Sequence, residues 1–294
     1  MGKPIFIAGP TATGKSAVAV QIAKKTGAEI ISVDSMQVYQ KMDIGTAKPS
    51  VKQREQIPHH IIDCTTINEG FDAARFVREV EEKKKKIKHA VFCGGTGLYF
   101  QAWLEGLGEA PPGELKIRTS LEETPIQDLL TELKEKDPAT YKSIDQHNPR
   151  RIIRAVEVIR ITDKPYSEQK AKWTKQAPEN FFLIERSPQD LRKRIEIRAE
   201  KMFKRGLVEE TCSLRSELEN NPSAQQALGY RQVIAHLKGE QSLPETVSLV
   251  KSRTWQYAKR QKTWFRKMNR ARRVVVPESE TPQRTAQRII ESIE

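Results

Sequence analysis

The fold is decided by residues 4–16, which read Pro4-Ile5-Phe6-Ile7-Ala8-Gly9-Pro10-Thr11-Ala12-Thr13-Gly14-Lys15-Ser16. The apolar first part predicts a buried strand. The second part matches the pattern G-x-x-x-x-G-K-[ST], which cradles phosphate when it lies between a strand and a helix. A stretch with helical spacing, Ala17–Lys25, follows directly. The sequence therefore predicts a phosphate-binding loop, although the loop does not reveal which phosphate compound it holds.

The residue types of this loop fit that role. Gly9 and Gly14 allow backbone angles that a side chain would forbid. Backbone N–H groups can then converge on an anion at the positive end of the following helix. Lys15 adds a point charge, and the hydroxyl of Ser16 can bind Mg²⁺. We therefore expect loop 9–16 to bind a phosphate with Mg²⁺, and Ser16 to be the metal ligand.

The composition limits the class of protein. Its 294 residues, 37% hydrophobic and 30% charged, suit a soluble globular chain with ample core. We expect no membrane span, because no apolar run approaches the roughly 20 residues that one needs. The predicted strand at Pro4 leaves no room for a signal peptide, and three scattered cysteines indicate a reduced, cytoplasmic location. The net charge of +13 favours a polyanionic partner such as nucleic acid.

Two further apolar runs end in polar turns. Ala28–Val33 leads into Asp34-Ser35-Met36-Gln37-Val38-Tyr39, and His89–Cys93 leads into Gly94-Gly95-Thr96-Gly97-Leu98-Tyr99. Because these runs alternate with helical patterns, they predict a parallel sheet whose strands all end at the same edge. Asp34 and Thr96 are therefore expected to face loop 9–16. Asp34 fits a general base or an Mg²⁺ partner and, equally well, a turn or helix-capping aspartate. Thr96 is a candidate substrate contact, unless its neighbouring glycines merely allow close helix packing.

The middle of the chain has a different character. Gly106–Gly113 is rich in turn residues, residues 114–180 show helical but no strand patterns, and Phe181–Glu185 reads as a return strand. The predicted fold class is α/β, with a P-loop NTPase-like parallel-sheet core and an all-helical insertion domain. The predicted domains are a core of residues 1–113 and 181–294, which includes basic C-terminal helices, and an insertion of residues 114–180.

Basic residues gather in two segments. The helical pattern Pro149–Ile161 carries arginines suited to phosphate contact, although an amphipathic helix with a solvated face is the simpler interpretation. Residues 251–273 hold ten basic residues, no acidic one and interleaved aromatic residues. That composition suits contact with a structured RNA.

Four blocks, in this order and spacing, resemble the bacterial tRNA dimethylallyltransferases, or tRNA isopentenyltransferases: Gly9–Ser16, Asp34–Tyr39, Asp43–Pro49 and Gly94–Tyr99. Tyr257-Ala258-Lys259-Arg260-Gln261-x-x-Trp264-Phe265-Arg266 also matches the family's C-terminal signature, so the resemblance covers essentially the whole chain. It implies transfer of a dimethylallyl group from dimethylallyl diphosphate to N6 of a tRNA adenine, with release of diphosphate. The adenine is the one 3′-adjacent to the anticodon.

The resemblance also implies roles for individual residues. Asp34, Thr11 and Arg198 would be catalytic, with Arg198 stabilising the pyrophosphate, whereas position alone would make Arg198 a surface arginine. The diphosphate would be bound by Gly9, Pro10, Thr11, Ala12, Thr13, Gly14, Lys15 and Ser16. The tRNA would be bound by Asp34, Ser35, Met36, Gln37, Thr96, Arg118, Arg150, Arg151, Ile152, Ile153 and Arg154. The expected partners are a tRNA anticodon stem-loop and dimethylallyl diphosphate, and we expect a monomer in the cytoplasm.

Other functions compete with this one. A small-molecule or nucleoside kinase would use the same loop for ATP, but the basic C-terminal segment would then have no purpose. A non-catalytic RNA-binding protein would tolerate replacement of Asp34 and Thr96. A transferase acting on free adenine nucleotides would not need so large a basic surface.

Overall fold

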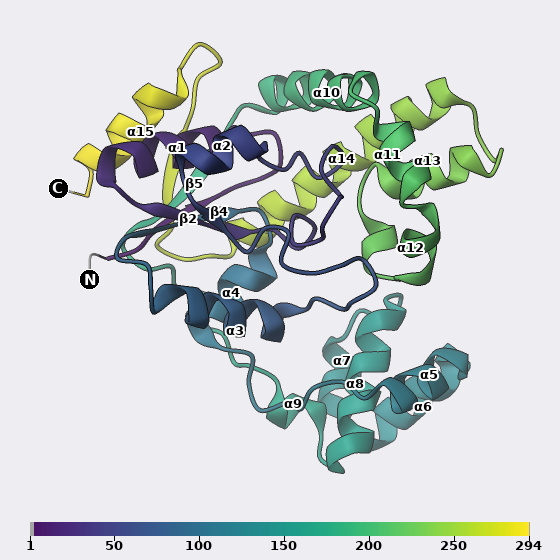
Figure 1. Cartoon of the computed structure of the whole chain (residues 1–294). Helices are drawn as coiled ribbons and strands as arrows, with labels where there is room; N and C mark the ends of the chain where they lie inside the picture. The colour runs from purple at the N-terminus through teal and green to yellow at the C-terminus, as the bar shows by residue number, and fades with distance from the viewer. Residues whose placement is uncertain (1–2, 294) are drawn as a thin grey trace. The chain divides into compact units, whose positions relative to one another are not determined.

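The computed structural model describes residues 3–293, which divide into two compact units. The core unit comprises the described residues up to Trp103 and from Lys175 onward, and the helical unit comprises Leu104–Thr174. The elements of the two units are given below, and Figure 1 labels most of them.

The core unit is built on a six-stranded sheet in which all strands are parallel, in the order β3-β2-β4-β1-β5-β6. The strands are β1 (Ile5–Ala8), β2 (Glu29–Val33), β3 (His59–His60), β4 (Ala90–Gly94), β5 (Phe181–Glu185) and β6 (Arg272–Val275). Ala8, the last residue of β1, is paired with Gly94 of β4 and with Leu183 of β5. The carboxyl ends of the central strands therefore meet at one edge, and the predicted α/β fold class is confirmed.

Helices cover both faces of this sheet. Figure 1 shows α1 (Lys15–Thr26) beside α15 (Pro282–Glu291) over one face, with α3 (Ala73–Lys84) and α4 (Gly97–Glu105) beyond the other. The long α10 (Pro188–Lys204) packs along α14 (Leu243–Arg266). The remaining elements are short: α2 (Val51–Gln56), α11 (Leu207–Ser213), α12 (Arg215–Asn220), η1 (Ala224–Gln226) and α13 (Tyr230–Leu237).

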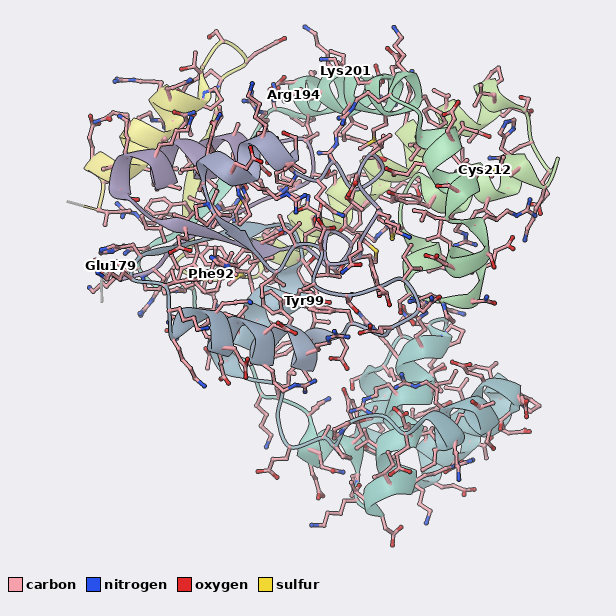
Figure 2. The ribbon with its side chains drawn as sticks, in the orientation of Figure 1. Phe92, Tyr99, Glu179, Arg194, Lys201 and Cys212 are labelled. Carbon is pink, nitrogen blue, oxygen red and sulfur yellow. The ribbon has the colours of Figure 1, made fainter. Side chains whose placement is uncertain are left out.

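Side chains alternate between the two faces of the sheet, as the two-residue period of a strand requires. On one face the rings of Phe92 and Phe181 stack on Phe6, at centroid distances of 5.0 and 5.8 Å, and α4 adds Phe100 to them. Figure 2 shows Phe92 and Tyr99 among the side chains of this layer. The opposite face packs aliphatic residues of β1, β4 and β5 against α1 and α15. The central strands are thus buried on both sides, which makes the edge at their ends a rigid platform.

Two edge strands differ from the sequence prediction. The segment 57–64 gives only the two-residue β3, because Ile61 and Asp63 adopt positive φ angles that end the strand. β6 was not predicted, since its first two residues are arginines that continue the basic segment before them. Only Val274 of β6 is buried, and the strand has no long apolar run that would indicate it in the sequence.

The helical unit contains α5 (Leu115–Glu123), α6 (Ile126–Lys136), α7 (Pro138–Ser143), α8 (Pro149–Thr162) and α9 (Tyr166–Gln169). Its own hydrophobic cluster joins α5, α6 and α8 around Leu129, Leu133 and Val156. The unit begins and ends earlier than the predicted boundaries 114 and 180. The Trp173 indole donates to the Gly106 carbonyl over 2.8 Å and a bridge pairs Gly108 with Lys170, so the connecting segments contact one another.

Among the described residues, no helix combines the length and the apolar character that crossing a bilayer requires.

Candidate active site

Loop 9–16 follows β1 directly and ends where α1 begins. Gly9 has a φ of +154°, and a Cβ there would lie 2.7 Å from the Ile184 carbonyl oxygen, so only glycine fits. Gly14 caps α1 with a φ of +92°. The sequence thus shapes a turn that brings the first backbone N–H groups of α1 to the strand-end edge, where they can bind an anion.

Two cations lie at this loop with little negative charge around them. Burial lowers the pKa of the Lys15 amine; Cys93 and Asp34 oppose that shift and Arg198 adds to it. Burial likewise lowers the pKa of the Arg198 guanidinium, and Asp34 is the group that opposes it. Lys15 and Arg198 therefore share one neighbouring carboxylate. A bound diphosphate would supply the negative charge that these cations lack.

Asp34 follows β2 and performs the turn role that its position allowed. Its Oδ1 accepts hydrogen bonds from the backbone N–H groups of Met36 at 2.9 Å and Gln37 at 3.3 Å. Because its charge raises the pKa of Lys15 and of Arg198, the carboxylate lies near both cations. Asp34 can thus serve both as a turn aspartate and as a reactive carboxylate.

Thr96 joins the turn after β4 to the turn after β2. Its backbone N–H donates to the Val33 carbonyl over 3.2 Å, and its Oγ1 accepts from the Ser35 N–H at 3.1 Å. Gly97 packs so closely that a Cβ there would lie 2.1 Å from the Trp264 ring. The glycines therefore do allow close packing, as the alternative held. Thr96 in addition holds the Asp34 turn in register with β4.

Sequence reasoning missed the network that supports the Asp34 turn. Gln37 Nε2 donates to the Thr46 carbonyl over 3.2 Å, which ties the turn to the loop 43–47. The backbone N–H groups of residues 43–45 converge on the carboxylate of Glu210, at 2.9–3.3 Å. The Tyr230 hydroxyl donates to that carboxylate over 2.6 Å. Neither Glu210 nor Tyr230 lies in one of the sequence blocks named above.

A buried lysine completes this support. The side chain of Lys48 is 1% exposed, and its Nζ contacts Asp43 Oδ1 at 2.6 Å and Asp63 Oδ1 at 2.5 Å. Its third contact is the Tyr39 carbonyl, at 2.8 Å. All three donors of the ammonium are thus used, so Lys48 fixes the loop rather than meeting a substrate.

Magnesium would have few protein ligands here. No group of three or more His, Cys, Asp or Glu side chains suited to a metal occurs among residues 3–293. Ser16 lies exposed at the start of α1. Mg²⁺ commonly keeps several waters and binds through substrate phosphates with one or two protein oxygens. The Ser16 hydroxyl, with Asp34 nearby, fits an ion held mainly by a diphosphate.

Within the helical unit, the predicted RNA-binding residues have different environments. The Ile152 side chain is fully buried in the cluster of α5, α6 and α8, so it supports the helix and presents nothing to RNA. Ile153 packs against the same cluster, while Arg150 and Arg151 are exposed on α8.

Arg118 and Arg154 meet at a buried carboxylate. The Glu157 side chain is 0% exposed, and its Oε2 accepts from Arg118 and from Arg154, both at 2.7 Å. The side chains of Arg118 and Arg154 remain 43% and 31% exposed. Both arginines therefore hold the helical unit together, and RNA contact by them stays a prediction.

Glu157 should matter more for stability than Glu132, a less buried carboxylate of the same unit. Glu157→Ala leaves two partly buried guanidinium groups without their carboxylate, which we expect to cost about 2 kcal/mol. Glu132→Ala removes the partner of Arg160 at a more exposed site and should cost about 0.5 kcal/mol. Urea unfolding followed by circular dichroism measures both losses. Equal losses would contradict the structural role of Glu157.

Lys15 should make pyrophosphate binding depend on pH. Its pKa is lowered, so the amine loses its proton and charge as pH rises, earlier than an ordinary lysine does. Above that pKa, affinity for inorganic pyrophosphate should fall by up to about tenfold per pH unit, because binding favours the charged amine. Isothermal titration calorimetry without metal measures this fall. In the Lys15→Arg variant pyrophosphate titrates as it does with the wild type, but the side chain keeps its charge. Identical pH profiles for the variant and the wild type would therefore contradict the role of Lys15.

The comparisons with known proteins all indicate the same family. A protein-family model described as IPP transferase matches residues 37–268. The chain is 40% identical over 277 residues to tRNA dimethylallyltransferase 1 of Citrifermentans bemidjiense, covering 91% of this chain and 90% of that one. It is 41% identical over 275 residues to the tRNA dimethylallyltransferase of Pediococcus pentosaceus, covering 90% and 88%.

Two solved structures share the fold across nearly all of this chain. The full-length tRNA isopentenylpyrophosphate transferase of Bacillus halodurans matches with a TM-score of 0.70 and 31% identity, covering 100% of this chain and 97% of that one. A eukaryotic dimethylallyltransferase acting on tRNA matches with a TM-score of 0.79 and 26% identity, covering 98% and 78%.

Proposed function

The chain belongs to the IPP transferase family, that of the tRNA dimethylallyltransferases, and we propose that dimethylallyl diphosphate is its donor. The acceptor is the N6 amine of the tRNA adenine 3′-adjacent to the anticodon. The relatives reported above are named as transferases that modify tRNA, and this speaks against the kinase alternative.

One observation carries the proposal: Lys15 and Arg198 are partly buried cations at loop 9–16 that share Asp34 as their neighbouring carboxylate. In this reaction the leaving group is a diphosphate, which departs with the electron pair of its bond to the allylic carbon. Fixed cations and backbone N–H groups that meet this developing charge lower the barrier. The hydroxyl of Thr11 would act on the same leaving group.

Asp34 has the chemistry to serve the acceptor. As the bond from the allylic carbon to N6 forms, the amine must lose a proton. A carboxylate held by Met36 and Gln37 can orient that amine and accept the proton without moving. Ser35, Met36, Gln37 and Thr96 line the turns beside it and would contact the adenine, which must leave its stack to reach them.

Magnesium would be held by Ser16 and by diphosphate oxygens, and it would neutralise charge on the leaving group. Lys15 and Arg198 would serve the same need as fixed charges of the chain itself.

The charge of the chain supports a tRNA anticodon stem-loop as partner. α14 and the residues that follow it carry ten basic residues between 251 and 273 and no acidic one. Arg150 and Arg151 add exposed charge on α8 of the helical unit. Such surfaces bind phosphate backbones through Coulomb attraction that salt weakens. We further propose that the protein acts as a monomer in the cytoplasm.

The proposal is tested by incubating the protein with unmodified tRNA and labelled dimethylallyl diphosphate, with γ-labelled ATP as the comparison donor. We expect label in tRNA from the isoprenoid only. Asp34→Asn should slow transfer by about 10²–10⁴-fold, the usual contribution of a general base, while tRNA binding stays nearly intact. The asparagine oxygen can still accept the Met36 and Gln37 hydrogen bonds, so the turn survives.

Asp72→Asn is the matched control for this variant. Asp72 caps α3 by accepting the Arg75 N–H, a role that asparagine performs equally well. It should therefore transfer at the wild-type rate. Label transferred from ATP, or full activity in Asp34→Asn, would overturn the proposed function.

A further inference from the structure

Three side chains contact loop 9–16 from outside. We propose that Gln261 of α14, Arg194 of α10 and Arg186, next to β5, are positioning residues that set which peptide N–H groups of the loop face the bound diphosphate. Figure 2 labels Arg194 on α10. The inference rests on the proposed function for the identity of the ligand, and on the loop geometry for everything else.

The argument starts from the shape of a peptide group. In a trans peptide the carbonyl and the N–H point in opposite directions, and the described chain has no cis peptide. A donor that holds a carbonyl on one side of the loop therefore turns the N–H of the same peptide toward the other side. Two such donors, Arg194 and Arg186, come from outside loop 9–16, and Gln261 acts on the loop as an acceptor.

Two arginines hold consecutive carbonyls. Arg194 Nε donates to the Ala12 carbonyl over 2.9 Å, and Arg186 Nε donates to the Thr13 carbonyl over 2.8 Å. The N–H groups of the same two peptides belong to Thr13 and Gly14, and they point away from the arginines. These N–H groups immediately precede α1, where an anion would bind.

Both arginines lie beside Gly14, at distances where a Cβ would be in ordinary van der Waals contact with them. A Cβ on Gly14 would lie 3.5 Å from Arg194 Nη2 and 3.8 Å from Arg186 Nη2. Arg186 is itself fixed, since its guanidinium pairs with Asp190 at 2.7 Å and both side chains are 5% exposed. The guanidinium group of Arg194 thus lies beside the rigid guanidinium group of Arg186. The positions of both groups are therefore well defined.

Gln261 holds an earlier peptide of the loop by its N–H, whereas the two arginines hold carbonyls. Its Oε1 accepts the Thr11 N–H at 2.8 Å, so this N–H is turned outward. The carbonyl of the same peptide, on Pro10, accepts from Lys15 Nζ at 3.3 Å. The Gln261 Nε2 donates to the Gly95 carbonyl over 2.9 Å, which fixes the orientation of the amide. Gln261 thereby ties the loop to the turn that carries Thr96.

Packing supports the outer side of the loop in part, since Ala12 lies against the apolar cluster of Leu191, Ile195 and Ala258. A largely apolar cavity of about 240 Å³ lies against Pro10 and Thr13, with Leu191, Trp255 and Ala258 among its other walls. The three external side chains therefore add to the contacts that orient these peptides, which include the bond from Thr13 Oγ1 to the Pro10 carbonyl at 2.9 Å.

Gln261→Leu is the sharpest test, because it removes both hydrogen bonds without changing the charge. We expect its affinity for inorganic pyrophosphate, measured by calorimetry, to fall about tenfold, while tRNA binding is unchanged. Gln256→Leu, on the same helix but away from the loop, should bind like the wild type. Gln261→Met replaces Gln261→Leu if the latter does not fold.

Substitutions of Arg194 provide a second test of the inference. Arg194→Gln should also weaken pyrophosphate binding about tenfold, and Arg194→Lys should restore most of it, because an ammonium can still donate to the Ala12 carbonyl. Arg192→Gln removes the same charge from the exposed side of α10 and should have little effect.

The outcomes separate this inference from the proposed function. Pyrophosphate binding that is unchanged in both Gln261→Leu and Arg194→Gln overturns the inference, even if the wild type modifies tRNA. A wild type that fails to transfer the isoprenoid, with pyrophosphate affinity still lost in both variants, overturns the proposed function and supports the inference.

Discussion

An anion can be held by backbone N–H groups only if those groups are fixed before the anion arrives, and much of the core unit serves that requirement. The parallel sheet brings the ends of β1, β2 and β4 to one edge, which places loop 9–16 beside the turns of Asp34 and Thr96. α10 and α14 then hold the loop from outside. The chemistry proposed for Asp34, Lys15 and Arg198 depends on this prior order.

The central part of the fold and site was predictable because it follows local rules. The apolar runs, the glycine positions and the G-x-x-x-x-G-K-[ST] spacing predict strand, loop and helix within one short stretch. The buried strands β1, β2, β4 and β5 follow the same logic. Parallel pairing then brings Asp34 to the side of the loop, since β4 pairs with both β2 and β1 and all three strands end at the same edge. β6 escaped prediction because its register depends on pairing with β5, and its own sequence begins with arginines.

The supporting contacts were not predictable from spacing. Gln261 lies 250 residues from Thr11 in the chain, and Glu210 lies 166 residues from Ile44. The charge pattern of α8 was equally ambiguous, because an arginine that pairs with a buried carboxylate looks in sequence like one that meets RNA. Arg154 bonds Glu157, whereas Arg151 is exposed, and only the packing of α8 distinguishes them.

A crystal structure of the protein with pyrophosphate and Mg²⁺ tests the central claim most directly. The account predicts pyrophosphate oxygens within hydrogen-bond distance of the Thr13 and Gly14 N–H groups, and of the Lys15 and Arg198 side chains. The Thr11 N–H should remain on Gln261. Pyrophosphate bound away from loop 9–16, or a Thr11 N–H that has turned inward to meet it, would contradict the account.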